Sequence, residues 1–152
     1  MNIRKGDKFD MPEVLQMIQE FQNQTITPKS LKEPLDMIYL NKLYHHIILG
    51  GGICLIAEQD NKIIGMMLGL KNGSVWFPSQ LTLNELMIYV RPEHRNSTVG
   101  GRLVKLYNKY AEEMRQNKEI VQYTVSVTQP FGKMNYEKLG YKKTEEIWSV
   151  GV

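Results

Sequence analysis

The sequence predicts a single mixed α/β domain, because helical and strand-like patterns alternate along a chain of modest length. Its 152 residues suit one domain with one hydrophobic core, so we expect residues 1–152 to form one unit. Apolar residues make up 42% and charged residues 23%, as in ordinary globular proteins. The sequence shows no internal repeat or linker that would divide it.

Two helices are predicted in the first third of the chain. Residues 11–22 carry apolar side chains at the spacing of one helical face. Residues 33–49 repeat this spacing, and three glycines at 50–52 end the second helix.

The middle of the chain predicts three strands. Residues 53–70 indicate two strands joined by Asp60, Asn61 and Lys62, which is the pattern of a hairpin. Residues 79–90 form a third strand that becomes apolar on both faces, as is typical of a central, buried strand.

The last third predicts alternating helices and strands. A helical stripe of apolar residues covers 99–114, and an alternating pattern at 120–127 predicts a strand. Residues 131–141 predict a short helix with Gly140 as its C-terminal stop. Residues 142–150 predict a final strand.

Charge and cysteine content exclude several classes of function. The formal net charge is +3, but no dense block of Lys and Arg predicts a nucleic-acid surface. Cys54 is the only cysteine, so no internal disulfide forms, and a cytoplasmic location is expected. No signal-peptide core and no membrane-length apolar segment is present, so we expect no membrane partner.

The junction "VRPEHRNSTVGGRL" at 90–103 places a polar, basic loop between a strand and a helix. The first turn of a helix has N–H groups without internal partners, and such an end binds phosphate readily. Arg95, Ser97 and Thr98 add donors, and Gly100 and Gly101 let a ligand approach the backbone. The same pattern also fits a capped helix after a turn. Neither the Walker P-loop nor the dinucleotide fingerprint is present.

The same segment resembles the acyl-CoA-binding motif of the GCN5-related N-acetyltransferases. In that family a strand ending in valine-x-proline precedes Gln/Arg-x-x-Gly-x-Gly/Ala and a helix. Here Val90 and Pro92 match the approach, and Arg95, Thr98 and Gly100 occupy the three defining positions.

A second motif strengthens the resemblance. "NYEKLGYKK" at 135–143 is similar to the family's "YEKLGF" segment, and it follows the first motif after a long helix and a strand. The predicted hairpin also matches the family's second and third strands, so the resemblance covers 53–143. It implies a mixed, mostly antiparallel sheet flanked by helices, and transfer of an acetyl group from acetyl-CoA to an amine.

The resemblance assigns the cofactor site to the end of the central strand and the loop after it. In the family this strand diverges from its neighbour, and its backbone holds the pantetheine arm and the thioester carbonyl. The implied cofactor-binding residues are Met87, Ile88, Tyr89, Val90, Arg95, Asn96, Ser97, Thr98, Val99, Gly100 and Gly101.

Two residues are the catalytic candidates. By resemblance, Tyr136 is the general acid that protonates the departing CoA thiolate, and otherwise it is a tyrosine packed on the short helix. Glu85 is a carboxylate in an apolar strand, which fits a general base or, alternatively, a strand-edge or substrate-contacting residue. Strict alternation puts Glu85 on one face with Leu83, Met87 and Tyr89.

One departure from the family pattern bears on affinity. The family usually has glycine where Thr98 stands, and a β-branched residue disfavours positive φ. Either the Thr98 hydroxyl compensates for the lost backbone freedom with a hydrogen bond to phosphate, or the threonine weakens cofactor binding.

The expected partners are acetyl-CoA and a primary amine of a small molecule or protein. The histidines and Cys54 lack metal-ligand spacing, so no metal is expected. The aromatic loop at 76–78 fits either an acceptor pocket or an oligomer contact, which leaves a homodimer open. Two other functions also stay open: a catalytically idle CoA-binding sensor or scaffold, and a nucleic-acid- or protein-binding domain without a cofactor.

Overall fold

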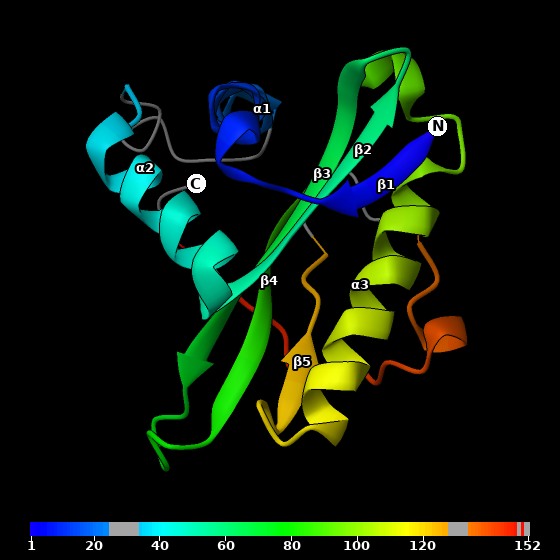
Figure 1. Cartoon of the computed structure of the whole chain (residues 1–152). Coiled ribbons are helices and arrows are strands. Elements are labelled where there is room, and N and C mark those ends of the chain that lie inside the picture. The colour runs from blue at the N-terminus through cyan, green and yellow to red at the C-terminus, as the bar shows by residue number, and fades with distance from the viewer. Residues whose placement is uncertain (25–33, 128–133, 149, 151–152) are drawn as a thin grey trace.

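A computed structural model of the chain, shown in Figure 1, describes residues 1–24, 34–127, 134–148 and 150. The strands are β1 (Asn2–Lys5), β2 (Gly52–Gln59), β3 (Lys62–Gly73), β4 (Leu81–Val90) and β5 (Gln122–Thr124). The α-helices are α1 (Met11–Gln24), α2 (Met37–His46) and α3 (Val99–Gln116).

The strands form one sheet in the order β1-β2-β3-β4-β5. Pairing is antiparallel from β1 to β4, and β5 joins β4 in parallel. The α3 helix covers one face of this sheet, and α1 and α2 lie on the other (Figure 1). The predicted fold class, a mixed and mostly antiparallel sheet flanked by helices, is therefore confirmed.

Each face of the sheet has its own hydrophobic core. The α3 core consists of Ile53, Leu55, Ala57, Ile64, Met67, Leu83, Val99, Leu103, Val104, Tyr107, Ala111 and Ile120. The core under α1 and α2 consists of Val14, Leu15, Met17, Ile18, Tyr44, Ile47, Cys54, Ile56, Met66, Leu68 and Tyr89. Cys54 is 4% exposed, and burial raises the pKa of its thiol to about 12, so it is a core residue with little thiolate at neutral pH.

The hairpin between β2 and β3 confirms the sequence prediction. Asp60 and Asn61 both have positive φ, at 52° and 59°, as a two-residue turn between antiparallel strands requires. Asparagine and aspartate tolerate this left-handed conformation better than other non-glycine residues.

Several predicted boundaries are wrong. The second helix ends at His46 and a π-helical turn at Ile47–Gly51 follows, within which Gly50 leaves the helical conformation with φ of 108°. The strand predicted at 120–127 shortens to β5, and residues 142–148, predicted as a strand, have no strand partner. Of the short helix predicted at 131–141, residues 131–133 lie outside the described residues.

Within the described ranges, no helix has both the length and the apolar character needed to cross a membrane. In the same ranges, no three His, Cys, Asp or Glu side chains gather as metal ligands would. Trp76 and Phe77 lie in the loop between β3 and β4 and are 82% and 58% exposed, which selects neither of the two roles considered for that loop.

Candidate active site

The strands β4 and β5 are paired over only the first part of β4. Pairing runs from Thr82 opposite Gln122 to Asn84 opposite Thr124 and goes no further. Among the residues that the structure describes, β4 is paired from Glu85 to Val90 with β3 alone. The sheet therefore opens between β4 and β5 directly after Asn84, and we call this opening the β4/β5 split.

A β-bulge in β4 lies at the start of the split. Gly69 of β3 pairs with Glu85, whereas the preceding Leu68 pairs with Met87. Leu86 is thus an extra residue in β4, and it is 37% exposed.

The bulge corrects the predicted orientation of Glu85. Because side chains alternate along a strand, one extra residue exchanges the two faces of the sheet. Leu83 packs in the α3 core, whereas Met87 and Tyr89 pack under α1 and α2. Glu85 precedes the bulge and shares its face with Leu83, so the prediction that it shares a face with Met87 and Tyr89 is wrong.

Glu85 is a buried carboxylic acid in the β4/β5 split. It is 8% exposed, and its Oε2 accepts a 2.9 Å hydrogen bond from the backbone N–H of Ser126. Burial raises the pKa of Glu85 to about 7, and the Ser126 bond opposes that rise. Near neutral pH the side chain can therefore both accept and release a proton.

Tyr136 lies close enough to Glu85 for the two to interact electrostatically. Its side chain is partly buried against the α3 core. Burial raises the pKa of the Tyr136 phenol, and the charge of Glu85 raises it further. The phenol is therefore fully protonated at neutral pH and can donate a proton.

The tyrosines around Tyr136 have other hydrogen-bond partners. Tyr107 donates to the backbone carbonyl of Thr124 at 3.4 Å, and Tyr141 donates to Oδ1 of Asn108. The Tyr141 ring contacts the Tyr136 ring edge-on at 5.8 Å. Within the described residues, the Tyr136 hydroxyl has no hydrogen-bond partner, so its proton is available to a ligand.

A short turn sets the position of Tyr136. The Asn135 side chain accepts a 3.1 Å hydrogen bond from the Lys138 N–H, so it caps this turn. A single 3-10 turn at Glu137–Leu139 replaces the longer predicted helix. Gly140 ends it with φ of 90°, as predicted for a C-terminal stop.

The loop at 95–98 leads into the first turn of α3. Ser97 Oγ donates to the His94 carbonyl at 2.5 Å and accepts from the Val99 N–H at 3.3 Å, so it caps the helix. Thr98 has φ of −83°, a conformation that threonine adopts without strain. The loop therefore does not need glycine at this position. Asn96 is exposed in the same loop.

Gly100 and Gly101 occupy the first turn of α3 without a packing reason for glycine. A Cβ on Gly100 would lie 3.8 Å from Met134 Cε and 3.9 Å from Val90 Cγ2, which are ordinary contact distances. A Cβ on Gly101 would enter open space. Each helical glycine lowers the stability of a helix by about 1 kcal/mol relative to alanine. The two glycines therefore leave the first turn of α3 without side chains at a cost in stability.

Arg95 is engaged away from the helix end. Its Nε donates to the Val90 carbonyl at 2.8 Å, its guanidinium donates to Oε1 of Gln24, and it lies over the Tyr89 ring at 5.4 Å. Gln24 also donates to the Tyr89 hydroxyl at 2.9 Å. Arg95 must leave Gln24 before it can contact a phosphate, so the backbone N–H groups are the donors already in place.

The remaining residues implied for the cofactor site, Met87 to Val90, lie along the split. Tyr89 is 3% exposed, and the side chains of Ile88 and Val90 pack against the α3 core, so all of these side chains are structural. Their backbone is hydrogen-bonded to β3 on one side only, and the other side faces the split.

Sequence reasoning missed three contributors to the site. Ser126 reaches Glu85 only because β5 ends early, and Gln24 reaches Arg95 only because α1 packs across the sheet. Tyr141 lies in the same 135–143 motif as Tyr136, and its ring packs edge-on against the Tyr136 ring. The bond between Tyr141 and Asn108 joins residues 33 positions apart, which no local pattern signals.

Several solved structures share this fold. A GCN5-related N-acetyltransferase from Ralstonia eutropha JMP134 superposes with a TM-score of 0.73 at 16% identity, covering 98% of this chain and 97% of that one. A ribosomal-protein-alanine N-acetyltransferase from Brucella melitensis biovar Abortus 2308 gives 0.69 at 15% identity, covering 98% and 96%. A predicted acetyltransferase from Clostridium acetobutylicum, solved with acetyl-CoA, gives 0.68 at 18% identity, covering 98% and 94%.

Sequence comparison places the chain in a family. None of the curated proteins matches the sequence closely enough to count as a relative. The model of the acetyltransferase (GNAT) domain matches residues 50–143, which include the split, the α3 loop and Tyr136. The protein is therefore a member of the GNAT acetyltransferase family.

Proposed function

We propose that the protein is an acetyl-CoA-dependent N-acetyltransferase that acts on a primary amine of a small molecule or a protein. One observation carries this proposal. A buried carboxyl group with a pKa near 7, Glu85, and an unpartnered phenol, Tyr136, lie near each other at the β4/β5 split. Amine acetylation needs both a proton acceptor and a proton donor.

The residues present fit acetyl-CoA as the donor substrate. The first turn of α3 carries no side chain at Gly100 and Gly101, so a ligand can approach its backbone N–H groups, and helix N-termini bind phosphate groups. The unpaired edge of β4 from Met87 to Val90 offers backbone N–H and carbonyl groups to an extended amide chain. Bound acetyl-CoA supplies the activated acyl group, and side chains of the protein carry out the proton transfers.

Two side chains perform these transfers in the proposed reaction. Ionised Glu85 takes a proton from the acceptor ammonium, directly or through water, because only a neutral amine attacks a carbonyl. Tyr136 gives its proton to the departing sulfur. A backbone N–H in the bulged part of β4 polarises the thioester carbonyl, since a bulge frees backbone groups from the ladder.

The proposed acceptor class follows from the same fold. One structurally similar protein is an aminoglycoside acetyltransferase from an uncultured soil sample, in complex with sisomicin, and another is the ribosomal-protein-alanine enzyme. Both small polyamines and protein amines therefore belong in the acceptor screen.

The proposal is tested in two steps. Acetyl-CoA at 100 times its Kd should stabilise the folded protein by about 2.7 kcal/mol and raise its melting temperature. Release of free CoA should then depend on an amine from a panel of polyamines, aminoglycosides, amino acids and peptides. A melting shift without release by any amine would identify an idle CoA-binding module. Absence of a shift would reject the cofactor site itself.

Gly100→Val should block the cradle without unfolding the helix. Valine forms helices better than glycine, and its Cβ meets only ordinary contacts. Isothermal titration calorimetry should show acetyl-CoA affinity lowered by about tenfold or more, which is roughly 1.4 kcal/mol. The melting temperature without ligand is the control for folding. Wild-type affinity in the folded variant would show that the phosphates bind elsewhere.

Thr98→Val should weaken acetyl-CoA binding by about 1 kcal/mol, the size of one neutral hydrogen bond. Because Thr98 already has a relaxed φ of −83°, Thr98→Gly should bring no gain in affinity. Calorimetry on both variants distinguishes these effects. Tighter binding by Thr98→Gly would instead show that threonine is a burden to the loop.

A further inference from the structure

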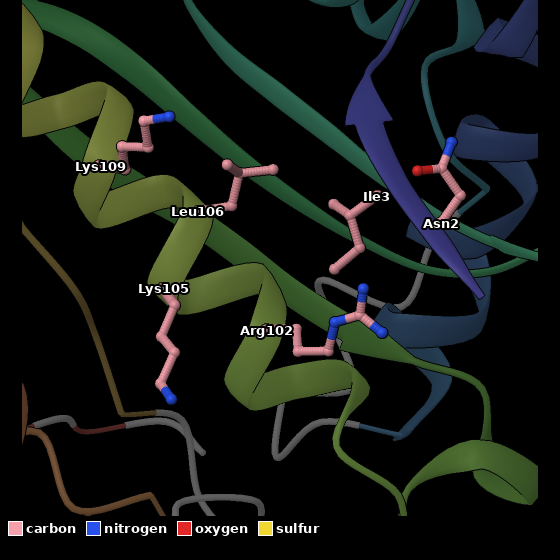
Figure 2. Close-up of a pocket in the computed structure, with 6 residues that line it drawn as sticks. All are labelled: Asn2, Ile3, Arg102, Lys105, Leu106 and Lys109. Carbon is pink, nitrogen blue, oxygen red and sulfur yellow. The ribbon is translucent and has the colours of Figure 1, made fainter.

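A basic groove lies between β1 and α3, as Figure 2 shows. Its volume is about 410 Å³, and its lining residues are Asn2, Ile3, Arg102, Lys105, Leu106 and Lys109. Ile3 and Leu106 face one another across its floor, and Arg102 extends from α3 towards β1 (Figure 2). We call it the β1/α3 groove.

The groove is separate from the proposed acetyl-CoA site. Asn108 of α3 contacts Tyr141, and Gly100 faces Met134, so that flank of the helix belongs to the proposed active site. Arg102 and Lys109 occur on the flank that faces β1. Around the helix axis, Arg102 and Lys109 lie about 100° or more from Gly100 and Asn108, whereas Lys105 lies between the two flanks, about 60° from Asn108.

The three cations of the groove lack a counter-charge. Arg102, Lys105 and Lys109 are exposed, and within the described residues none of them forms an ion pair. Like charges three to four residues apart destabilise a helix by a few tenths of a kcal/mol per pair. Their grouping is therefore unfavourable for the isolated fold, and it matches an anionic partner.

The other wall of the groove is an open sheet edge. The β1 strand is the first in the sheet order and pairs only with β2. Gly6 donates to the Cys54 carbonyl, so by alternation the N–H groups of Ile3 and Lys5 turn to the open side. Such an edge accepts an extended peptide as an added strand.

We propose that the β1/α3 groove binds an extended acidic segment of a partner protein, which pairs with β1 and directs its carboxylates at Arg102 and Lys109, while Lys105 adds positive charge beside the groove. The stretch from Arg102 to Lys109 spans roughly 10 Å of helix, the length of about three residues of a strand. Alternate acidic residues of an added strand share the α3 face of the sheet with Ile3 and reach these cations, while the residues between them point to the opposite face. The apolar floor and the strand edge favour a peptide over a nucleic acid.

Fluorescence anisotropy tests the proposal with a labelled decapeptide of alternating glutamate and valine, at about 50 mM salt. The wild-type protein should bind it, and Arg102→Gln/Lys105→Gln/Lys109→Gln should weaken binding about tenfold or more. Lys62→Gln/Lys118→Gln/Lys142→Gln removes the same charge from other exposed positions and should change affinity less than threefold. Acetyl-CoA affinity should be equal in all three proteins.

A second readout locates the bound peptide. Hydrogen exchange at the amides of Ile3 and Lys5 should slow when the peptide is added. Equal losses in the two triple variants would show general charge attraction and overturn the proposal. Tighter binding of a ten-nucleotide oligo-dT than of the acidic peptide, or unchanged exchange at both amides, would also overturn it.

Discussion

Tyr136→Phe is expected to lower turnover by about 10²- to 10⁴-fold, the usual contribution of a positioned general acid. The substitution keeps the ring that packs edge-on against Tyr141 and removes only the hydroxyl. Because that hydroxyl has no partner within the described residues, its removal should leave the fold and acetyl-CoA affinity unchanged. The measurement is steady-state turnover with the best acceptor, together with calorimetry.

Tyr110→Phe is the matched control, since it removes a phenol hydroxyl from the β1 side of α3, where Lys5 lies over the ring. Its turnover should equal that of the wild type. If Tyr136→Phe also keeps wild-type turnover while chemistry limits the rate, Tyr136 has no part in proton transfer. Water or the substrate must then protonate the sulfur.

Glu85→Gln is expected to lower turnover at pH 8 by about 10²-fold or more, because the amide cannot accept a proton. In the wild type, kcat/KM should rise about tenfold per pH unit up to about pH 7 and then level off, following ionisation of Glu85. The Gln variant should lose this inflection. An unchanged inflection near pH 7 in the variant would assign the base to another group.

The same substitution should stabilise the protein at high pH. The raised pKa means that Glu85 holds its proton in the folded state at pH values where the unfolded chain has released it. Its favourable contribution is complete below about pH 4.5 and is lost as the pH rises through about 7. Chemical denaturation should therefore show Glu85→Gln more stable than wild type at pH 8, by up to about 3 kcal/mol, and little changed at pH 4. Glu113→Gln, on the exposed side of α3, should show no such difference.

Local patterns in the sequence predicted the elements that carry their own signal. The hairpin, β4 and α3 were predicted because turn residues and apolar spacing act over a few neighbouring residues. β1 was missed because "NIRK" has one apolar residue, and its strand conformation comes from pairing with β2. The strand predicted at 142–150 was wrong over 142–148 because alternation alone does not provide a neighbouring strand.

The sequence predicted which residues form the candidate site better than it predicted how their side chains are arranged. The motif around Arg95, Gly100 and Tyr136 identified the family, which the matching domain model confirms. Strict alternation along β4 could not predict which residues share a sheet face with Glu85, because a bulge at Leu86 exchanges the two faces of the sheet. A bulge depends on register with β3, which lies more than ten residues away along the chain.

The same bulge determines which side chains of β4 face each layer of the protein. Leu83 and Glu85 face the α3 layer, where the proposed proton donor and acceptor lie, and after the bulge Ile88 and Val90 face this layer too, whereas Met87 and Tyr89 face the layer under α1 and α2. Glu85 and Met87 therefore belong to different layers although they are only two positions apart in the strand, so a substitution at Met87 or Tyr89 acts on the core under α1 and α2 and not on the layer that holds Glu85.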